Sequence, residues 1–125
     1  MSKPQRVKNY SAVSESRLRN ARMSARKARL VCDLIRGKRV GEALNLLSLT
    51  HKPSACPDVY NLLKSARHNA INNKGFSTVE ADDLVVGTVF VDGATMMKRM
   101  RPAPMGRGVK IRKRTCHITI RLNEQ

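Results

Sequence analysis

Arginine and lysine side chains are concentrated in one segment of this chain that contains no acid. No Asp or Glu occurs between Asp92 and Glu124, and residues 93–117 read GATMMKRMRPAPMGRGVKIRKRTCH. Guanidinium and ammonium groups bind phosphate oxygens and displace the counterions around a nucleic acid. Two prolines and two glycines near the middle of the segment are typical of a turn. The segment therefore predicts a basic hairpin stabilised by surrounding phosphates, with a disordered basic loop as the alternative.

The charge of the whole chain supports a polyanionic partner. The 125 residues include 25 Lys and Arg but only 9 Asp and Glu, a formal net charge of +16. A compact protein with this charge repels itself unless a polyanion neutralises it. Nucleic acid is the polyanion that such a composition favours. The length suits one small domain, and the absence of Trp predicts an aliphatic core.

A membrane surface is the rival polyanion. No stretch approaches the roughly 20 apolar residues that span a bilayer, and few aromatic residues are present to anchor the chain at an interface. No apolar run follows the basic residues Lys3, Arg6 and Lys8, so we expect no secretory signal. Three widely spaced cysteines argue against a disulfide scaffold and for a reducing compartment.

The sequence contains few combinations of residues that could form a catalytic or metal site. Asp82 and Asp83 are adjacent acids just before a predicted strand, where a turn or cap is the simpler role. Cys116 and His117 are neighbours, which is poor geometry for chelating one tetrahedral metal ion. The chain also lacks a GxxxxGK[ST] phosphate loop. We expect no enzyme activity, no metal and no cofactor.

Hydrophobic periodicity predicts an α+β fold with three helices packed on a small three-stranded antiparallel sheet and a long protruding β-hairpin. We expect residues 1–14 to form a flexible basic N-terminal arm and residues 15–125 a single globular domain, with the hairpin at about 88–121. The expected strands lie at Ser16–Met23, Leu84–Val91 and His117–Leu122. The expected helices run from an N-cap at Ser24 to Gly37, over Val40–Leu47, and from Pro57 to just before Lys74 and Gly75.

Basic residues also line the first expected strand and helix. The apolar stripe of that helix is formed by Ala28, Val31, Leu34 and Ile35, and its cations lie largely off the stripe. A basic helix face is often only solvated, but here the cations continue on both sides of the helix, which favours a surface that faces RNA. The residues that we expect to bind RNA in this region are Arg17, Arg19, Arg22, Arg26, Lys27, Arg36, Lys38 and Arg39.

Four motifs resemble those of one family. They are KARLVCDLIRGKRVGEALNLL (27–47), LLKSARHNAINN (62–73), VFVD (89–92) and IRKRTCHITI (111–120). In this order and spacing they resemble the twenty-second protein of the large ribosomal subunit, in its compact bacterial form. The resemblance implies a structural, non-catalytic protein that binds large-subunit rRNA early in assembly. It also implies a cytoplasmic ribosome, with an organellar ribosome left open.

The resemblance also implies where the basic hairpin lies in the ribosome. In the family the hairpin runs through rRNA and lines the peptide exit tunnel beside the fourth protein of the large subunit, where it meets the nascent polypeptide and affects macrolide response and stalling. No homo-oligomer is expected. The rRNA-binding residues expected in and beside the hairpin are Lys98, Arg99, Arg101, Arg107, Lys110, Arg112, Lys113, Arg114 and His117. The tip that would face the tunnel comprises Arg101, Pro102, Ala103, Pro104, Met105, Gly106 and Arg107.

The tip departs from the family pattern. Bacterial members read close to PRAKGRA, whereas this chain reads PAPMGRG, so Ala103 and Met105 replace two positions that are usually basic. A free-standing nucleic-acid-binding protein is the second function that the charge allows. The two functions differ in selectivity, because a ribosomal protein copurifies with the large subunit through high salt and a non-specific binder washes off.

Overall fold

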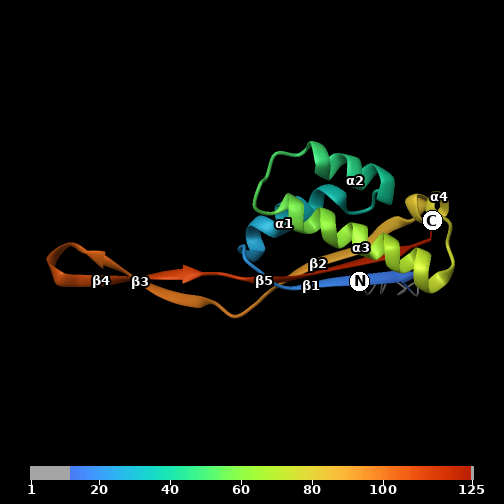
Figure 1. Ribbon diagram of the computed structural model, residues 1–125. Coiled ribbons are helices and arrows are strands. Elements are labelled where there is room, and N and C mark those ends of the chain that lie inside the picture. Colours follow the sequence, from blue (N-terminus) through green and yellow to red (C-terminus); the bar gives the residue numbers. More distant parts are fainter. Residues whose placement is uncertain (1–11, 125) are drawn as a thin grey trace, which may run out of the picture.

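The computed structural model describes residues 12–124 and has an α+β architecture. Most of the predicted N-terminal arm, residues 1–11, lies outside the described residues. The described part contains a three-stranded sheet with helices on one side of it and a separate two-stranded sheet (Figure 1). The predicted fold class and the three-stranded antiparallel sheet are confirmed.

The three-stranded sheet has the order β1-β5-β2, with both neighbours antiparallel to the central strand. Its strands are β1 (Ser14–Ala21), β2 (Val85–Gly93) and β5 (Cys116–Asn123). Every second side chain of β5 is apolar, which gives the strand one buried face. Ile118, Ile120 and Leu122 on that face are completely buried. The strongest alternation in the sequence thus belongs to the centre of the sheet.

An irregularity in β1 explains why its apolar residues do not alternate cleanly. The register against β5 shifts between Leu18 and Ala21, and Asn20 has a left-handed backbone with φ of 56°. An extra residue of this kind moves the following side chains to the other face of the sheet. The strand also begins earlier than predicted, because Ser14 pairs with Leu122.

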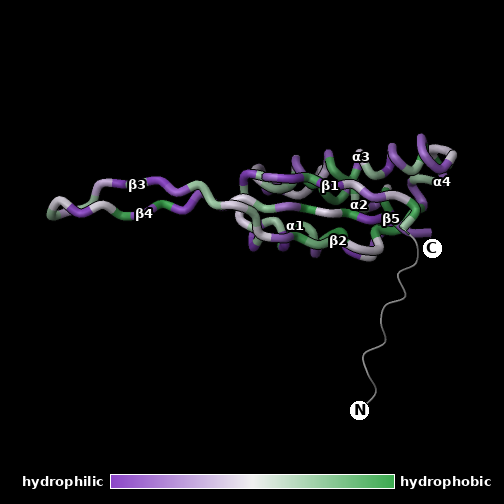
Figure 2. Tube along the Cα trace, turned by 90° about the horizontal axis from the view of Figure 1, so that it is seen from below, coloured by the Kyte–Doolittle hydropathy of each residue, from purple (hydrophilic) through white to green (hydrophobic). Residues whose placement is uncertain are grey.

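The three expected helices are confirmed as α1 (Ala25–Ile35), α2 (Val40–Leu49) and α3 (Cys56–Lys74). Ser24 caps α1 with its hydroxyl, which accepts from the Lys27 N–H, and Gly75 ends α3 with a φ of 71°. Among the described residues, the helices all lie on one side of the sheet (Figures 1 and 2). The prediction that Leu34 belongs to the apolar, buried face of α1 is wrong. Leu34 is 42% exposed, and Cys32 is buried in the core instead.

A fourth helix, α4 (Thr78–Asp83), corrects the predicted number of three. It begins with a capping box in which the Ser77 hydroxyl accepts from the Glu80 N–H and the Glu80 carboxylate accepts from the Ser77 N–H. The Ser-x-x-Glu spacing that carries this box is visible in the sequence. With only six residues, α4 is too short for hydrophobic periodicity to reveal it.

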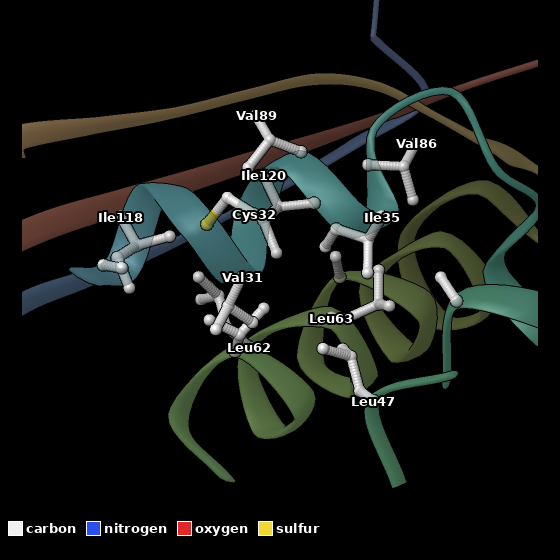
Figure 3. Packing of buried hydrophobic residues seen from close by; sticks show 14 of the residues in the cluster. Val31, Cys32, Ile35, Leu47, Leu62, Leu63, Val86, Val89, Ile118 and Ile120 are labelled. Carbon is white, nitrogen blue, oxygen red and sulfur yellow. The ribbon is translucent and has the colours of Figure 1, made fainter. Parts of the chain in front are cut away.

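The core between the sheet and the helices is aliphatic, as the composition predicts. Ala66 and Ala70 of α3 are completely buried, and such small side chains let the helix approach the sheet closely. Figure 3 shows α1, α3 and the sheet contributing side chains to one continuous cluster. The labelled members are Val31, Cys32, Ile35, Leu47, Leu62, Leu63, Val86, Val89, Ile118 and Ile120.

The two-stranded sheet, which we call the basic ribbon (residues 97–113), consists of β3 (Met97–Ala103) and β4 (Arg107–Lys113). The strands pair antiparallel from Met97 opposite Lys113 to Ala103 opposite Arg107. The turn η1 (Pro104–Gly106) joins them, and Met105 and Gly106 both have positive φ. No residue of either strand is buried. Figures 1 and 2 show the ribbon extending beyond one end of the three-stranded sheet.

Candidate nucleic-acid interface

The predicted RNA-binding cations are accessible. All sixteen Arg and Lys side chains named from the sequence are exposed, and His117 is half-buried. Most of them lie on the basic ribbon or at the junction between the ribbon and α1. Arg17 and Arg36 lie beside the middle of the three-stranded sheet, and Lys38 and Arg39 lie at its opposite end. The junction is the place where cations from separate parts of the sequence come together.

The basic ribbon has two different faces. Residues that pair across antiparallel strands share a face, and neighbours along a strand alternate. Arg99 therefore lies on the same face as its partner Ile111, and Arg101 on the same face as Val109. Lys98 and Arg112 form a pair on the opposite face. Met100 on that second face covers Gly108, since a Cβ at Gly108 would lie 2.4 Å from the methionine methyl carbon.

A first hollow of about 550 Å³ lies where α1 begins beside the chain segments that lead into the ribbon. Three arginines, Arg26, Arg29 and Arg114, lie in its wall, and no acidic residue does. Arg29 was not among the predicted site residues. It was missed because only the fold brings it next to Gly93 and Thr115.

A second hollow of about 600 Å³ lies on the other side of Ser24 and Arg114, two residues that line both hollows. Six of its ten lining residues are Arg or Lys, and again none is acidic. The cations come from the start of α1 and from the root of the ribbon: Arg22, Lys27, Arg99, Arg112, Lys113 and Arg114. Ser54 from the α2–α3 loop completes this wall.

Most of the cations that line the two hollows have no partner inside the described part of the protein, although Arg29 donates to the Val91 carbonyl and Arg99 to the Lys98 carbonyl. Within residues 12–124, the side chains of Arg22, Arg26, Lys27, Lys113 and Arg114 make no hydrogen bond or ion pair. Unpaired cations that face one another repel, and this costs folding stability unless an anion neutralises them. The two hollows therefore have the charge to attract anionic groups.

Hydrogen bonds fix the root of the ribbon to the sheet. The buried Thr115 hydroxyl donates to the Thr95 carbonyl at 2.7 Å, and the Ala94 N–H donates to the Thr115 carbonyl at 3.1 Å. Gly93 and Cys116 form the last pair of the three-stranded sheet, next to these hydrogen bonds. These contacts join the two linkers between the sheets.

Several predicted site residues have partners inside the protein. The Arg36 guanidinium donates to Asp33 at 2.6 Å and to the Val89 carbonyl at 2.8 Å. Arg17 pairs with Glu15, whose carboxylate also accepts from Arg121 at 3.1 Å. These hydrogen bonds with the two arginines, the Arg17 bond above all, lower the pKa of Glu15.

Two further predicted sites lie close to the main chain of the sheet. His117 Nδ1 accepts from the N–H of Asn20 at 3.1 Å, so the other ring nitrogen is the one left to act as a donor. Arg39 bridges to Val85, and the Lys38 carbonyl accepts from Val86. Lys38 and Arg39 thus lie at the end of the sheet remote from the basic ribbon.

The described part of the chain offers little support for a metal site, a catalytic acid pair or a membrane-spanning helix. No group of three or more His, Cys, Asp or Glu in residues 12–124 is arranged to hold a metal ion. Asp82, one of the two adjacent acids, pairs with Arg67 at 2.6 Å and ties α4 to α3. Among the same residues, no helix is long and apolar enough to cross a membrane.

Comparison with protein families covers nearly the whole chain. The family described as Ribosomal protein L22p/L17e matches residues 16–123, which include all four helices and both sheets except the first two residues of β1. Proteins of this family are structural components of the large ribosomal subunit and bind rRNA. The acid-free ribbon and the two basic hollows fit that role. The chain therefore belongs to the ribosomal protein L22p/L17e family, as a structural, non-enzymatic constituent of the large ribosomal subunit that binds rRNA.

Proposed function

We propose that the basic ribbon is the main rRNA-binding element of this chain, that it supports assembly of the large subunit, and that its tip lines the peptide exit tunnel. The single observation that carries the proposal is the composition of the ribbon. It holds seven Arg or Lys side chains from Lys98 to Lys113, no acid and no buried residue. A two-stranded ribbon with such a charge is marginal alone in water. RNA phosphates would supply the missing stabilisation.

Phosphate and sugar contacts would position the ribbon without reading base sequence. The arginines can also stack on unpaired bases, which is how proteins bind RNA loops and junctions. Specificity would then come from the shape of the rRNA around the ribbon. The cations of the junction and of the first strand would extend the same interface onto the globular domain.

The tip is the part proposed to face the tunnel, beside the fourth large-subunit protein and the nascent polypeptide. Met105 is 94% exposed at the outer end of the turn, and Arg107 follows it at the first position of β4. A flexible apolar side chain beside a cation can contact peptides of varied sequence. Ala103 and Met105 make this tip less basic than the family pattern. Its contacts with a nascent chain would therefore be more apolar.

The rRNA role is tested by titrating the full chain against a transcript of the large-subunit rRNA over a range of salt concentrations. The double variant Arg99→Gln/Arg101→Gln should bind at least 10-fold more weakly, with a salt slope reduced by about 1 per removed contact. Lys64→Gln/Lys74→Gln removes the same charge from α3 and serves as the matched control. Equal affinities for the two double variants would refute a dominant role of the ribbon.

The tunnel role needs a separate test on assembled subunits. A photo-crosslinking amino acid at Met105 should capture an arrested nascent chain, whereas the same group at Leu49, which is 84% exposed on α2, should not. Crosslinks from Leu49 alone would overturn the placement of the tip and leave the rRNA role intact. Reconstitution of large subunits with and without the chain would test the assembly role.

A further inference from the structure

We propose that the two hollows at the junction hold consecutive phosphate–sugar units of one single strand of rRNA, which crosses the root of the basic ribbon with Arg114 between the two units. This inference rests on the proposed rRNA binding. It goes further by naming the part of the surface that binds the backbone and the kind of RNA that fits there.

The size of the hollows favours a single strand. Their volumes of about 550 and 600 Å³ fall in the range of pockets that take one small molecule, about 300–1,000 Å³. A phosphate–sugar unit fits such a space, and a duplex does not. Duplex RNA is instead bound across broad surfaces that span successive grooves.

The charge of the hollows favours the backbone over the bases. The combined walls contain eight cations and no acid: Arg22, Arg26, Lys27, Arg29, Arg99, Arg112, Lys113 and Arg114. The first turn of α1 lies between the hollows and contains no acidic residue either. Phosphate groups are the part of RNA that such a wall attracts.

The shared wall favours continuity of the strand. Ser24 and Arg114 line both hollows, so a backbone that leaves one hollow enters the other across these two side chains. A guanidinium presents donors on two edges and can bind oxygens of two phosphates at once. Arg114 makes no hydrogen bond or ion pair within the described part of the chain, which leaves it available for this contact.

The path of the strand also follows from the geometry. Three of the four ribbon residues in the wall of the second hollow, Met97, Arg99 and Lys113, share one face of the ribbon, and the fourth, Arg112, lies on the other. A strand that leaves this hollow therefore continues along the face with Arg101 and Val109. Farther from the root, the opposite face with Met100 and Lys110 would meet other parts of the rRNA.

The test uses hydroxyl-radical cleavage from single tethered iron chelates on the full chain bound to the large-subunit rRNA transcript. The tether sites are Met96→Cys in the wall of the first hollow and Ser54→Cys in the wall of the second. The native cysteines Cys32, Cys56 and Cys116 are buried, so the new thiol is the one that reacts in the folded protein. Asn73→Cys, exposed at the far end of α3, is the control site.

Both hollow sites should cleave one continuous stretch of a few nucleotides, with overlapping cuts, and the control site should cleave elsewhere. Cuts in two segments that are far apart in the rRNA sequence would overturn the single-strand proposal. So would bound protein that gives no cuts from either hollow. Failure of the wild-type chain to bind the transcript would overturn the rRNA role itself, which keeps the two failures distinguishable.

A second measurement isolates Arg114. Arg114→Gln and Lys110→Gln each remove one charge and should each lower the salt slope of binding by about 1. Because Arg114 would bind oxygens of two phosphates, Arg114→Gln should weaken binding several-fold more than Lys110→Gln. Arg114→Lys keeps the charge but cannot form two directed contacts at once, so it should retain the wild-type slope and lose affinity. Equal losses of affinity for Arg114→Gln and Lys110→Gln would overturn the bridging role. Thermal unfolding checks that the variants remain folded.

Discussion

The Arg36 guanidinium donates a hydrogen bond of 2.8 Å to the main-chain carbonyl of Val89. Val89 lies on β2, an edge strand whose outer carbonyls have no neighbouring strand in the sheet. Arg29, two turns earlier on α1, donates in the same way to the Val91 carbonyl at 2.9 Å. Two arginines, one within α1 and one at its C-cap, thus satisfy carbonyls on the exposed edge of the sheet, which would otherwise be open to pairing with another chain.

Replacement of Arg36 should therefore affect folding. Arg36→Ala leaves the part-buried Val89 carbonyl without its charged donor, and we expect the free energy of unfolding to fall by about 1–2 kcal/mol. Urea denaturation measures the change. Arg26→Ala, on the same helix but without a partner inside the described part, should stay within about 0.5 kcal/mol of wild type. Equal stability of Arg36→Ala and wild type would show that the carbonyl is satisfied by water.

The root of the basic ribbon depends on Thr115. Thr115→Val keeps the shape of the side chain but removes the hydroxyl that donates to the Thr95 carbonyl. We expect a loss of about 0.5–1.5 kcal/mol of stability and faster hydrogen exchange at Ala94, whose N–H donates to Thr115. Thr119→Val, at a buried site on β5 without a side-chain hydrogen bond in the described part, is the control. Unchanged exchange at Ala94 would contradict the role of the hydroxyl.

Buried thiols predict a loss of stability at high pH. Burial raises the pKa of the Cys32 thiol to about 11, above its ordinary value of 9.0, and burial also raises the pKa of Cys116. Between pH 9 and 11 the unfolded chain loses the Cys32 proton and the folded chain keeps it. Stability therefore falls as pH rises through this window, by up to about 1.4 kcal/mol per pH unit for one thiol. Well below pH 9 the Cys32 thiol is protonated in both states, so it does not change the pH dependence of stability there.

Urea titrations between pH 8 and 11 measure this dependence. Cys32→Ala serves as the control, because it retains the contributions of the lysines and tyrosines. The variant should have a flatter profile in this window than wild type. Parallel profiles would show that Cys32 does not contribute.

The capping box of α4 predicts a local effect. Ser77→Ala removes the hydroxyl that accepts from the Glu80 N–H, and loss of such a cap costs about 0.5–2 kcal/mol. Asp82 lies on the same helix, so its ion pair with Arg67 should weaken as the helix frays. Hydrogen exchange at Ala81 and urea denaturation measure the two effects. Thr78→Ala, one residue further along, should have little effect on either.

Much of the fold follows from local patterns in the sequence. The Ser24 cap and the Gly75 stop bound α1 and α3, because both depend on backbone groups within a few residues. The alternation of Ile118, Ile120 and Leu122 identifies β5 for the same reason. The bulge in β1 and the burial of Cys32 in place of Leu34 could not be read in this way. Both depend on how the strand and the helix dock onto their neighbours.

The sequence by itself determined that this chain binds a polyanion and that residues 93–117 form its most basic segment, because charge and composition do not depend on folding. Only the tertiary structure decided which cations remain available. It places Arg114 between two hollows beside the start of α1, and it engages Arg36 with β2. The physical reason is that a guanidinium binds whichever acceptor lies within hydrogen-bond reach. When the guanidinium and its acceptor are far apart in the sequence, the packing of α1 against the sheet decides which acceptor lies within reach.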